Sequence, residues 1–369
     1  MARIAVNGRF LRYRTTGVQR YARELVRALT PVLARRGDEL VVLAPASRLE
    51  PPDADAPVIR AGGPLGDYLW EQLILPRMFR RARADLLWSP CNLGPVSVAS
   101  QVVTIHDAAV LAHREWFKPW FAWTYRRLLP RLGRVAQRVV TDSQFSATEL
   151  VAYGIADPAK IRVVHAGVTT RPAGERGSRL SARPYILTVS SLEPRKNLDR
   201  LFAAWSRVAQ TAALESYQLL VVGAEGPVFA GRRGKLPPPP RTTFLGYIGD
   251  EALYEYYRGA HAFVYVSLYE GFGLPPLDAL HWGVPVLAAD IPSLREACGD
   301  AALFCNPLSV DEIADGLIRV AIDDAVRSQL AARGRTRAAQ FTWERAARQL
   351  AAVFAEVVGP AQRRARSIA

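Results

Sequence analysis

Residues 267–280 read "SLYEGFGLPPLDAL", in which two carboxylates, Glu270 and Asp278, bracket a Gly/Pro-rich turn. The turn follows an apolar run typical of a buried strand, and Pro275 suits the first turn of a helix, where its missing N–H removes no bond. Free amides at a helix start, with the helix dipole, favour a phosphate group. Carboxylates repel phosphate and are better suited to accept hydrogen bonds from hydroxyls of a sugar or ribose. The stretch therefore predicts a strand–turn–helix unit that binds a nucleotide sugar.

A second loop has the same layout. Residues 188–202 read "TVSSLEPRKNLDRLF", a strand, a charged turn and a helix capped by Asn197. Lys196, one of only four lysines in the chain, stands just before that helix. A cation there gains nothing from the helix dipole, so a bound phosphate would account for it. The alternative is a solvated surface loop.

The pattern of strands and helices predicts two domains. The chain has 369 residues, 50% of them hydrophobic, which is too long for one ordinary core. Strand-like runs alternate with helical segments, interrupted by a Gly/Pro-rich linker at 167–183. The first long helix follows Thr16, its expected cap. We expect an α/β fold of two Rossmann-like doubly wound domains facing a cleft, which is the default ligand site. The expected boundaries are 1–172, 183–345 and a final helix, 346–369, that packs back on the first domain.

The net charge indicates what kind of partner the protein binds, and the cysteines indicate its redox compartment. The net charge is +14, and residues 1–183 carry 28 Lys and Arg against 15 Asp and Glu. The first half should therefore attract an anionic partner: nucleic acid, a phosphate-bearing substrate or an acidic membrane. Cys91, Cys298 and Cys305 form no CxxC, so we expect neither disulfides nor zinc, and a reducing cytoplasm fits. The sequence shows no apolar run long enough to span a bilayer and no secretory signal.

Seven segments in order resemble retaining glycosyltransferases of the GT-B type, specifically glycosyltransferase family 4. The resemblance covers essentially the whole chain. The segments are "NGRFLRYRTTGVQRYARELVRAL", "IHDAAVLAHREWF", "RVVTDSQFSATEL", "IRVVHAGV", "SLEPRKNL", "FLGYIGDEAL" and "SLYEGFGLPPLDALHWGVPVLAA". It implies a hexosyltransferase with a nucleotide-sugar donor.

The resemblance also implies roles for residues of the second domain. Glu270 corresponds to the acid that contacts donor-sugar hydroxyls, and Lys196 to the diphosphate lysine. Asp278 takes the ribose position, where the family usually has Glu. An Arg that usually accompanies the lysine is missing; Ser191 stands near its place, and Arg195 is a candidate substitute. Backbone groups complete the expected donor site: Phe272, Gly273 and Leu274 at the phosphate, and Gly246, Tyr247 and Ile248 at the base.

Three residues of the first domain join the expected site. Gly17 opens a helix and is suited to approach the diphosphate from across the cleft. His106 in "TIHD" ends a strand and, by the resemblance, contacts the donor sugar; alternatively it packs against a neighbouring carbonyl. Asp107 either orients the acceptor hydroxyl or caps a turn. No metal is expected, because the "DAD" at 53–55 lies in a Pro/Ala-rich run without a strand to hold it, and no cofactor is expected.

Residues 114–138 interleave six aromatic side chains with basic ones. This mixture suits a membrane interface, although it could also bind single-stranded nucleic acid or pack its rings in the core. We favour attachment to the inner face of the cytoplasmic membrane and a polyprenyl-diphosphate-linked saccharide as acceptor, with no nucleic acid.

The favoured reaction is transfer of mannose from GDP-mannose to a hydroxyl of that saccharide, with retention, in bacterial surface polysaccharide synthesis. The donor rests on the likeness of "TTGVQRYARE" to polysaccharide mannosyltransferases. The alternatives are a UDP- or dTDP-sugar donor, a sugar-nucleotide epimerase or phosphorylase, a nucleic-acid-binding protein, and a non-catalytic scaffold.

Overall fold

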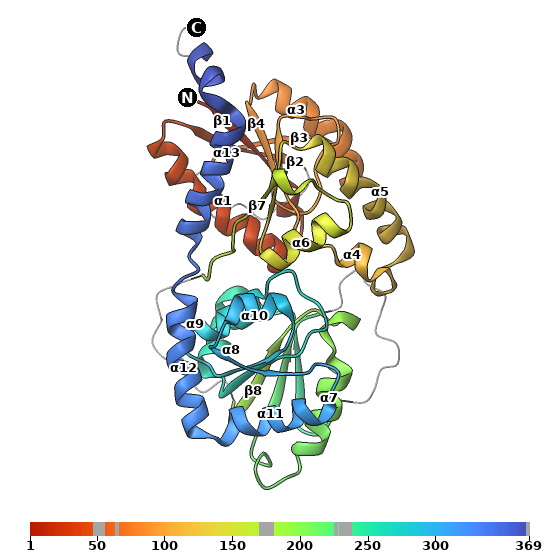
Figure 1. Cartoon of the computed structure of the whole chain (residues 1–369), viewed down its shortest axis with the longest axis vertical. Helices are drawn as coiled ribbons and strands as arrows, with labels where there is room; N and C mark the ends of the chain where they lie inside the picture. Colours follow the sequence, from red (N-terminus) through yellow and green to blue (C-terminus); the bar gives the residue numbers. More distant parts are fainter. Residues whose placement is uncertain (47–55, 63–65, 170–180, 225–227, 229–237, 367–369) are drawn as a thin grey trace. The chain divides into compact units, whose positions relative to one another are not determined.

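The computed structural model describes residues 1–46, 56–62, 66–169, 181–224, 228 and 238–366. The chain forms two compact units. The first comprises Met1–Ala112, Trp123–Gly167 and Phe341–Ala369, and the second comprises His113–Ala122 and Val168–Gln340. Figure 1 labels the elements of both.

The first unit is built on a seven-stranded parallel sheet with the order β3-β2-β1-β4-β5-β6-β7. The order reverses direction between β1 and β4, as in a doubly wound fold. Its strands are short and mostly buried, because helices cover the sheet (Figure 1). They are β1 (Arg3–Asn7), β2 (Glu39–Pro45), β3 (Val58–Ala61), β4 (Leu86–Ser89), β5 (Gln101–Thr104), β6 (Arg138–Thr141) and β7 (Ile161–Val163).

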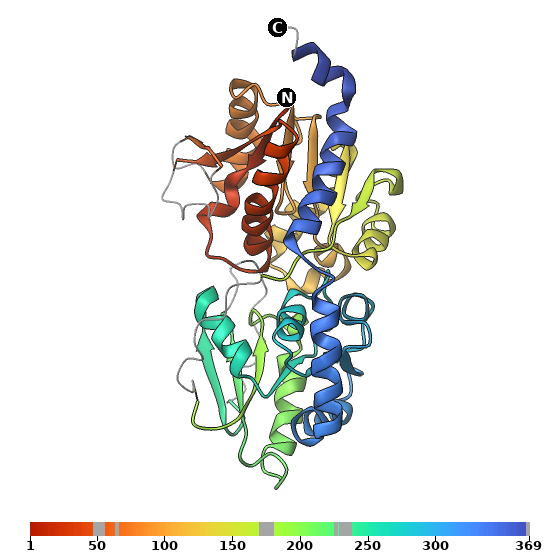
Figure 2. The ribbon, with the colours of Figure 1, turned by 90° about the vertical axis from the view of Figure 1, so that its left-hand side faces the viewer.

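The helices around this sheet include the last one of the chain. They are α1 (Gly17–Arg35), α2 (Asp67–Leu69), the π-helical turn η2 (Trp70–Ile74), α3 (Leu75–Arg81), α4 (Ala109–Ala112), α5 (Pro119–Val135), α6 (Gln144–Ala152) and α13 (Trp343–Arg366). Figures 1 and 2 show α13 running beside α1. Arg36 Nη1 donates to Ala351 O at 2.9 Å, and the rings of Tyr21 and Trp343 pack edge to face. The final helix therefore packs on the first unit.

The second unit repeats the architecture with six parallel strands in the order β10-β9-β8-β11-β12-β13. Its reversal point lies between β8 and β11. The strands are β8 (Tyr185–Val189), β9 (Gln218–Val222), β10 (Thr242–Gly246), β11 (Ala262–Tyr265), β12 (Val286–Ala289) and β13 (Ala302–Cys305). The helices are α7 (Leu198–Val208), α8 (Asp250–Gly259), α9 (Leu274–His281), α10 (Pro292–Cys298), α11 (Val310–Ile322) and α12 (Asp324–Ala338).

The predicted fold class, two Rossmann-like α/β domains, is confirmed. The units differ from the expected boundaries in three places. The second unit begins at Val168, although the first domain was expected to extend to 172. Residues 113–122 group with the second unit, where the Lys118 N–H donates to Val228 O at 2.9 Å and the ring of His113 packs against Tyr269. The return to the first unit begins at Phe341, five residues before the expected 346, because Trp343 already packs on Tyr21.

Two expected helix caps are wrong in detail. Thr16 and Asn197 do occupy N-cap positions, but neither side chain caps its helix. The Thr16 hydroxyl bonds instead to Gln19, and the Asn197 amide reaches other backbone carbonyls. Across the part of the chain that the structure describes, no helix is both long and apolar enough to cross a bilayer.

Candidate active site

Two loops of the predicted donor site lie at the reversal point of the second sheet. Ser191 to Lys196 follow the carboxyl end of β8, and Glu270 to Leu274 follow the neighbouring β11. Ligands of open parallel sheets bind at the carboxyl ends of strands where the strand order reverses. The sequence motifs and the topology therefore indicate the same place.

Lys196 and Glu270 form a buried ion pair at this place. Lys196 Nζ lies 2.6 Å from Glu270 Oε1 and donates to the Tyr265 hydroxyl at 2.8 Å. Both charged residues are buried, and Lys196 is only 7% exposed. A surface-loop interpretation of Lys196 is therefore wrong, because its ammonium group has left solvent and depends on these partners.

Arg195 lies beside this pair. Its Nη1 is 3.9 Å from Glu270 Oε2, and its Nε donates to Glu193 Oε1 at 2.8 Å. The Ser191 hydroxyl donates to the same Glu193 oxygen at 2.8 Å. The structure thus brings Arg195 to the Lys196–Glu270 pair and ties Ser191 to Glu193. Glu193 was missed by the sequence analysis, although its acid in "SLEPRK" was the available signal.

The electrostatics of the cluster follow from burial and close cations. Burial and the nearby Arg195 lower the pKa of Lys196, which the Glu270 carboxylate only partly offsets. Burial alone would raise the pKa of Glu270, but Lys196 and Arg195 hold it below the ordinary value. Burial raises the pKa of Tyr265 well above its ordinary value. Glu270 is therefore an anion at neutral pH, between two cationic side chains.

Asn197 joins the two loops that carry these side chains. Its backbone is left-handed, with φ of 58°, a conformation that Asn adopts more readily than most residues. Its Nδ2 donates to Val266 O at 2.9 Å and to Pro307 O at 2.7 Å. The Leu268 N–H also donates to Arg195 O at 2.8 Å. These bonds fix the spacing between Lys196 on one loop and Glu270 on the other.

The turn before α9 requires a glycine. Gly273 has φ of 115°, and a Cβ there would meet Leu294 Cδ2 at 2.6 Å. Gly273 is the N-cap of α9 and offers no side chain to its amides. Phe272 is buried just before it, and Asp278 is buried within α9. Pro275 and Pro276 carry no N–H, and the Leu277 N–H donates to Gly273 O at 3.4 Å, so the N–H of Leu274 is the donor that the first turn of α9 can offer to a ligand.

The segment expected to face the base, residues 246–248, follows the edge strand β10. Gly246 ends the strand with φ of 67°, and its carbonyl accepts from the Gly223 N–H at 2.8 Å. Gly223 in turn lies against Ser190, where a Cβ would meet Ser190 O at 1.9 Å. The carboxyl ends of β8, β9 and β10 are therefore contiguous. Tyr247 is exposed beyond them, and Ile248 is half-buried.

His106 lies in the first unit and is held at both ring nitrogens. Nδ1 is 2.5 Å from Asp142 Oδ2, Nε2 is 2.9 Å from Pro90 O, and the ring packs edge to face on Tyr21. Burial alone would lower the pKa of His106, but the Asp142 carboxylate raises it above the ordinary value. The packed alternative is present in this structure, and Asp142 was missed by the sequence analysis.

The other two predicted residues of the first unit are Asp107 and Gly17. Asp107 Oδ1 accepts from the Ala109 N–H at 3.0 Å at the start of α4, which is the turn-capping alternative. Gly17 begins α1, and a Cβ built on it would meet nothing within 4 Å.

A buried polar cluster at the reversal point of the first sheet was also missed. Asn7 ends β1, and its Nδ2 donates to Glu71 Oε1 at 2.5 Å. Arg9 Nη1 lies 3.2 Å from Glu71 Oε2, and all three residues are buried. Glu71 is carried by the π-helical turn η2, a geometry that often marks functional sites.

Metal ligands are not grouped in the described part of the chain, where no three His, Cys, Asp or Glu side chains could hold an ion together. The "DAD" at 53–55 lies outside the described residues.

Comparison with known proteins agrees with this geometry. Residues 15–172 match the family described as "Glycosyltransferase Family 4", and residues 175–337 match "Glycosyl transferases group 1". The O-antigen chain mannosyltransferase B of Escherichia coli is 29% identical over 368 residues, which cover 90% of this chain and 94% of that protein.

Two further proteins are similar to this chain, one in sequence and one in fold. A serotype-specific mannosyltransferase, WbdA of Escherichia coli, is 28% identical over 66% of this chain, and the match spans only 32% of that longer protein. The fold resembles a sucrose-phosphate synthase from Thermosynechococcus elongatus, with a TM-score of 0.73 and 20% identity over 97% of this chain and 99% of the other. The chain therefore belongs to glycosyltransferase family 4 and is a glycosyltransferase of the GT-B fold.

Proposed function

We propose that this glycosyltransferase moves mannose from GDP-mannose to a hydroxyl of a lipid-linked saccharide, with retention, in the synthesis of a bacterial surface polysaccharide. The choice of mannose and of polysaccharide synthesis is supported by the similarity to O-antigen chain mannosyltransferase B, which extends over 90% of this chain. The match to WbdA, also a mannosyltransferase, points the same way.

The observation that carries the proposal is the buried Lys196–Glu270 pair at the reversal point of the second sheet. In the proposed complex the donor diphosphate is held by the ammonium of Lys196, the guanidinium of Arg195 and the backbone N–H of Leu274 at the start of α9. Glu270 then accepts hydrogen bonds from hydroxyls of the transferred sugar. A buried pair of opposite charges suits such a ligand. The ammonium of Lys196 gains a phosphate oxygen, and the carboxylate of Glu270 gains sugar hydroxyls, so neither charge is left without a partner.

Leaving-group stabilisation is the central step of the proposed chemistry. Negative charge grows on the diphosphate as the glycosidic bond breaks, and preorganised cations and amides in a buried site stabilise such charge strongly. Lys196, Arg195 and the start of α9 supply this without a metal ion in the proposal. A departing diphosphate oxygen that takes the proton of the acceptor hydroxyl on the same face would give retention.

The first unit is proposed to contribute His106 and the acceptor side. A donor-sugar hydroxyl would replace Pro90 O as the partner of His106 Nε2, while Asp142 keeps the imidazole oriented. The buried Arg9–Glu71 pair at the carboxyl end of β1 is a candidate for holding acceptor hydroxyls. Asp107 is retained as a candidate for orienting the attacking hydroxyl.

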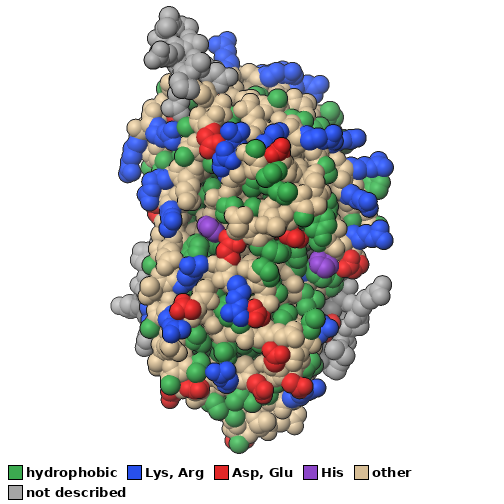
Figure 3. Space-filling model, in the orientation of Figure 1, with side chains coloured by type: hydrophobic (Ala, Val, Ile, Leu, Met, Phe, Trp, Pro, Cys, Tyr) green, Lys and Arg blue, Asp and Glu red, His purple; other side chains and the backbone are tan. Residues whose placement is uncertain are grey.

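Attachment to the inner face of the cytoplasmic membrane is proposed through α5. Trp120 and Trp123 are 52% and 58% exposed, and three residues apart on a helix they share a face. Arg127 lies over the Trp123 ring at 4.1 Å. Figure 3 shows further basic side chains along the edge of the first unit that carries α3 and α5. Exposed rings beside cations suit an interface with anionic lipid.

This attachment has a direct test. The double variant Trp120→Ser/Trp123→Ser should lose binding to vesicles of phosphatidylcholine with phosphatidylglycerol. Tyr153→Ser removes an exposed ring from another helix end and serves as the control. Equal vesicle binding by the double variant and the wild type would argue against α5.

The donor assignment is tested first by binding and then by turnover. Thermal unfolding with GDP, UDP, dTDP and ADP, each with EDTA, should show stabilisation by GDP of about 2.7 kcal/mol at a hundred times its dissociation constant. Lys196→Met should remove most of that effect. GDP-mannose and a lipid-linked saccharide should then yield an α-linked product. Selective stabilisation by UDP or dTDP would replace the donor, and turnover without acceptor would indicate an epimerase. No response to any nucleotide would count against the donor site itself.

A further inference from the structure

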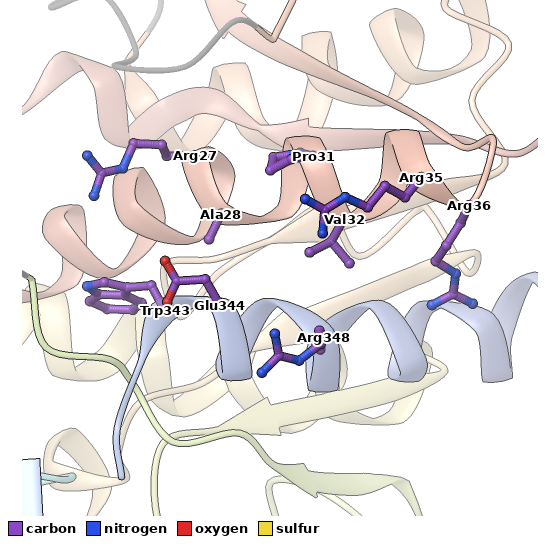
Figure 4. A pocket seen from close by; sticks show the side chains of 9 residues that line it. All are labelled: Arg27, Ala28, Pro31, Val32, Arg35, Arg36, Trp343, Glu344 and Arg348. Carbon is purple, nitrogen blue, oxygen red and sulfur yellow. The ribbon is translucent and has the colours of Figure 1, made fainter. Parts of the chain in front are cut away.

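A groove between α1 and α13, within the first unit, gathers arginines that the proposed donor site does not use. Its volume is about 440 Å³. Arg35 and Arg36 at the end of α1 line it together with Arg348 from α13, and Glu344 lies on the same wall as Arg348. Figure 4 shows Arg36 extending from α1 toward α13, while the side chain of Arg35 runs alongside α1.

The groove exists because small side chains separate the two helices there. Ala28 and Val32 are four residues apart and lie in one row on α1, beside Pro31. Trp343 closes one end from α13 and is itself buried. Short side chains along a helix contact leave a hollow that the longer arginines surround rather than fill.

The cations of the groove lack acidic partners. In the described structure, the side chains of Arg35 and Arg348 make no hydrogen bond or ion pair, and neither does Glu344. Arg36 donates only to the backbone carbonyl of Ala351 at 2.9 Å. Arg27, by contrast, pairs with Glu24 at 2.6 Å and turns away from the other three in Figure 4. Three arginines that form no ion pair in the described structure therefore line one groove, with Glu344 as the one acidic side chain among its lining residues.

Helix electrostatics alone do not explain this arrangement. Cations at the carboxyl end of α1 are favoured by its dipole, which accounts for Arg35 and Arg36. Arg348 stands in the second turn of α13, near the positive end of that helix, where the dipole does not favour a cation. Its place opposite two other arginines adds like-charge repulsion, which a bound anion would relieve.

We infer that this groove binds a phosphate group, as a site separate from the donor site. Guanidinium groups hold phosphate oxygens through two parallel hydrogen bonds, and three arginines line this groove. The unpartnered carboxylate of Glu344 accepts a hydroxyl or ammonium group carried beside that phosphate. Such a ligand is either a lipid headgroup or a soluble phosphate ester. The inference does not depend on which sugar the enzyme transfers.

The test compares two double variants with the same loss of charge. Arg35→Gln/Arg348→Gln removes two groove cations. Arg60→Gln/Arg319→Gln removes two exposed arginines elsewhere that likewise form no ion pair in the described structure. Both pairs are placed in a Lys196→Met background, so that binding at the donor site does not contribute to the measured affinity. A failure of the donor-site proposal can then be distinguished from a failure of the groove proposal. Circular dichroism and thermal midpoints confirm that each protein is folded.

Calorimetric titration with inorganic pyrophosphate is the first readout. The groove variant should bind roughly tenfold more weakly or worse than its background, because two charge-assisted contacts are lost. The control pair should bind like its background. Equal affinities for the two pairs would overturn the inference. A single-stranded oligonucleotide that binds more tightly than pyrophosphate, and is weakened alike by both pairs, would also overturn it in favour of a general basic surface.

Vesicle flotation then identifies the source of the phosphate, given a positive first result. Loss of binding to phosphatidylcholine–phosphatidylglycerol vesicles by the groove variant alone would assign the site to a lipid headgroup. Unchanged flotation, with weakened pyrophosphate binding, would assign it to a soluble phosphate ester.

Discussion

Lys196 Nζ and Glu270 Oε1 lie 2.6 Å apart, although 74 residues of sequence separate them. Each comes from the loop that follows a strand at the reversal point of the second sheet. The pair is buried, and Arg195 and the Tyr265 hydroxyl are its other neighbours. Removing the acid therefore has consequences for both activity and stability.

Glu270→Gln should reduce kcat/KM by roughly ten- to a hundredfold, since a charge-assisted contact to the sugar is worth roughly 1.5–3 kcal/mol. It should lower the free energy of unfolding by about 3 kcal/mol, because Lys196 is left buried beside Arg195 without its anion. Kinetics and urea unfolding measure the two effects.

The matched control is Glu255→Gln, which makes the same chemical change in a surface pair with Arg258. It should cost less than about 1 kcal/mol and leave turnover unchanged. Full activity of Glu270→Gln would remove Glu270 from the proposed mechanism.

His106 should make the free energy of unfolding depend on pH above pH 6.5. Asp142 raises its folded pKa above the ordinary 6.5, so the folded state binds the proton more tightly than the unfolded state does. The contribution is fully present below pH 6.5 and is lost as pH rises through the folded pKa. Asp142→Asn should remove that dependence, as measured by urea unfolding across pH 6–9. An imidazole titration of His106 below 6.5 by NMR would contradict this assignment.

The sequence predicted the two sheets because apolar runs alternated with helical patterns along the chain. It missed β3, β7 and β13, which lie at the edges of their sheets and are only partly buried. The central strands β4, β5 and β12 are equally short but wholly buried, so their continuous apolar runs were recognisable.

The candidate site was predicted where a motif is local and missed where a contact is long-range. Lys196, Glu270 and Gly273 stand in short recognisable segments. Asp142 and Glu71 gain their meaning only from distant partners that folding supplies: His106, and Arg9 with Asn7. Glu193 is different, because its partners Ser191 and Arg195 lie two residues away, and only the folded turn shows that these side chains meet. Asn197 shows the same limit, because the sequence indicated a helix cap while the fold uses its amide to join two loops.

Asp278 should govern discrimination between ribose and deoxyribose in the donor. Wild-type protein should bind GDP about 10–100 times more tightly than 2′,3′-dideoxy-GDP, because a carboxylate contact to ribose hydroxyls is lost. Asp278→Asn should weaken GDP binding and leave the dideoxy nucleotide little changed. The control Asp315→Asn removes an exposed acid from α11. Equal discrimination by Asp278→Asn and the wild type would place the ribose elsewhere.

Gly17 offers a test of backbone approach that does not disturb the fold. A Cβ at this position would meet no atom of the protein within 4 Å, and alanine is a better helix former than glycine. Gly17→Ala should therefore keep or slightly raise the thermal midpoint. If the donor diphosphate approaches the start of α1, the added methyl group should lower kcat/KM by roughly tenfold or more, since small displacements of bound substrate are costly.

Gly66→Ala is the matched control, because it also faces open space in the first unit. Gly17→Ala with the kinetics of Gly66→Ala would show that the diphosphate does not reach this helix, and the role of the first unit in donor binding would then rest on His106.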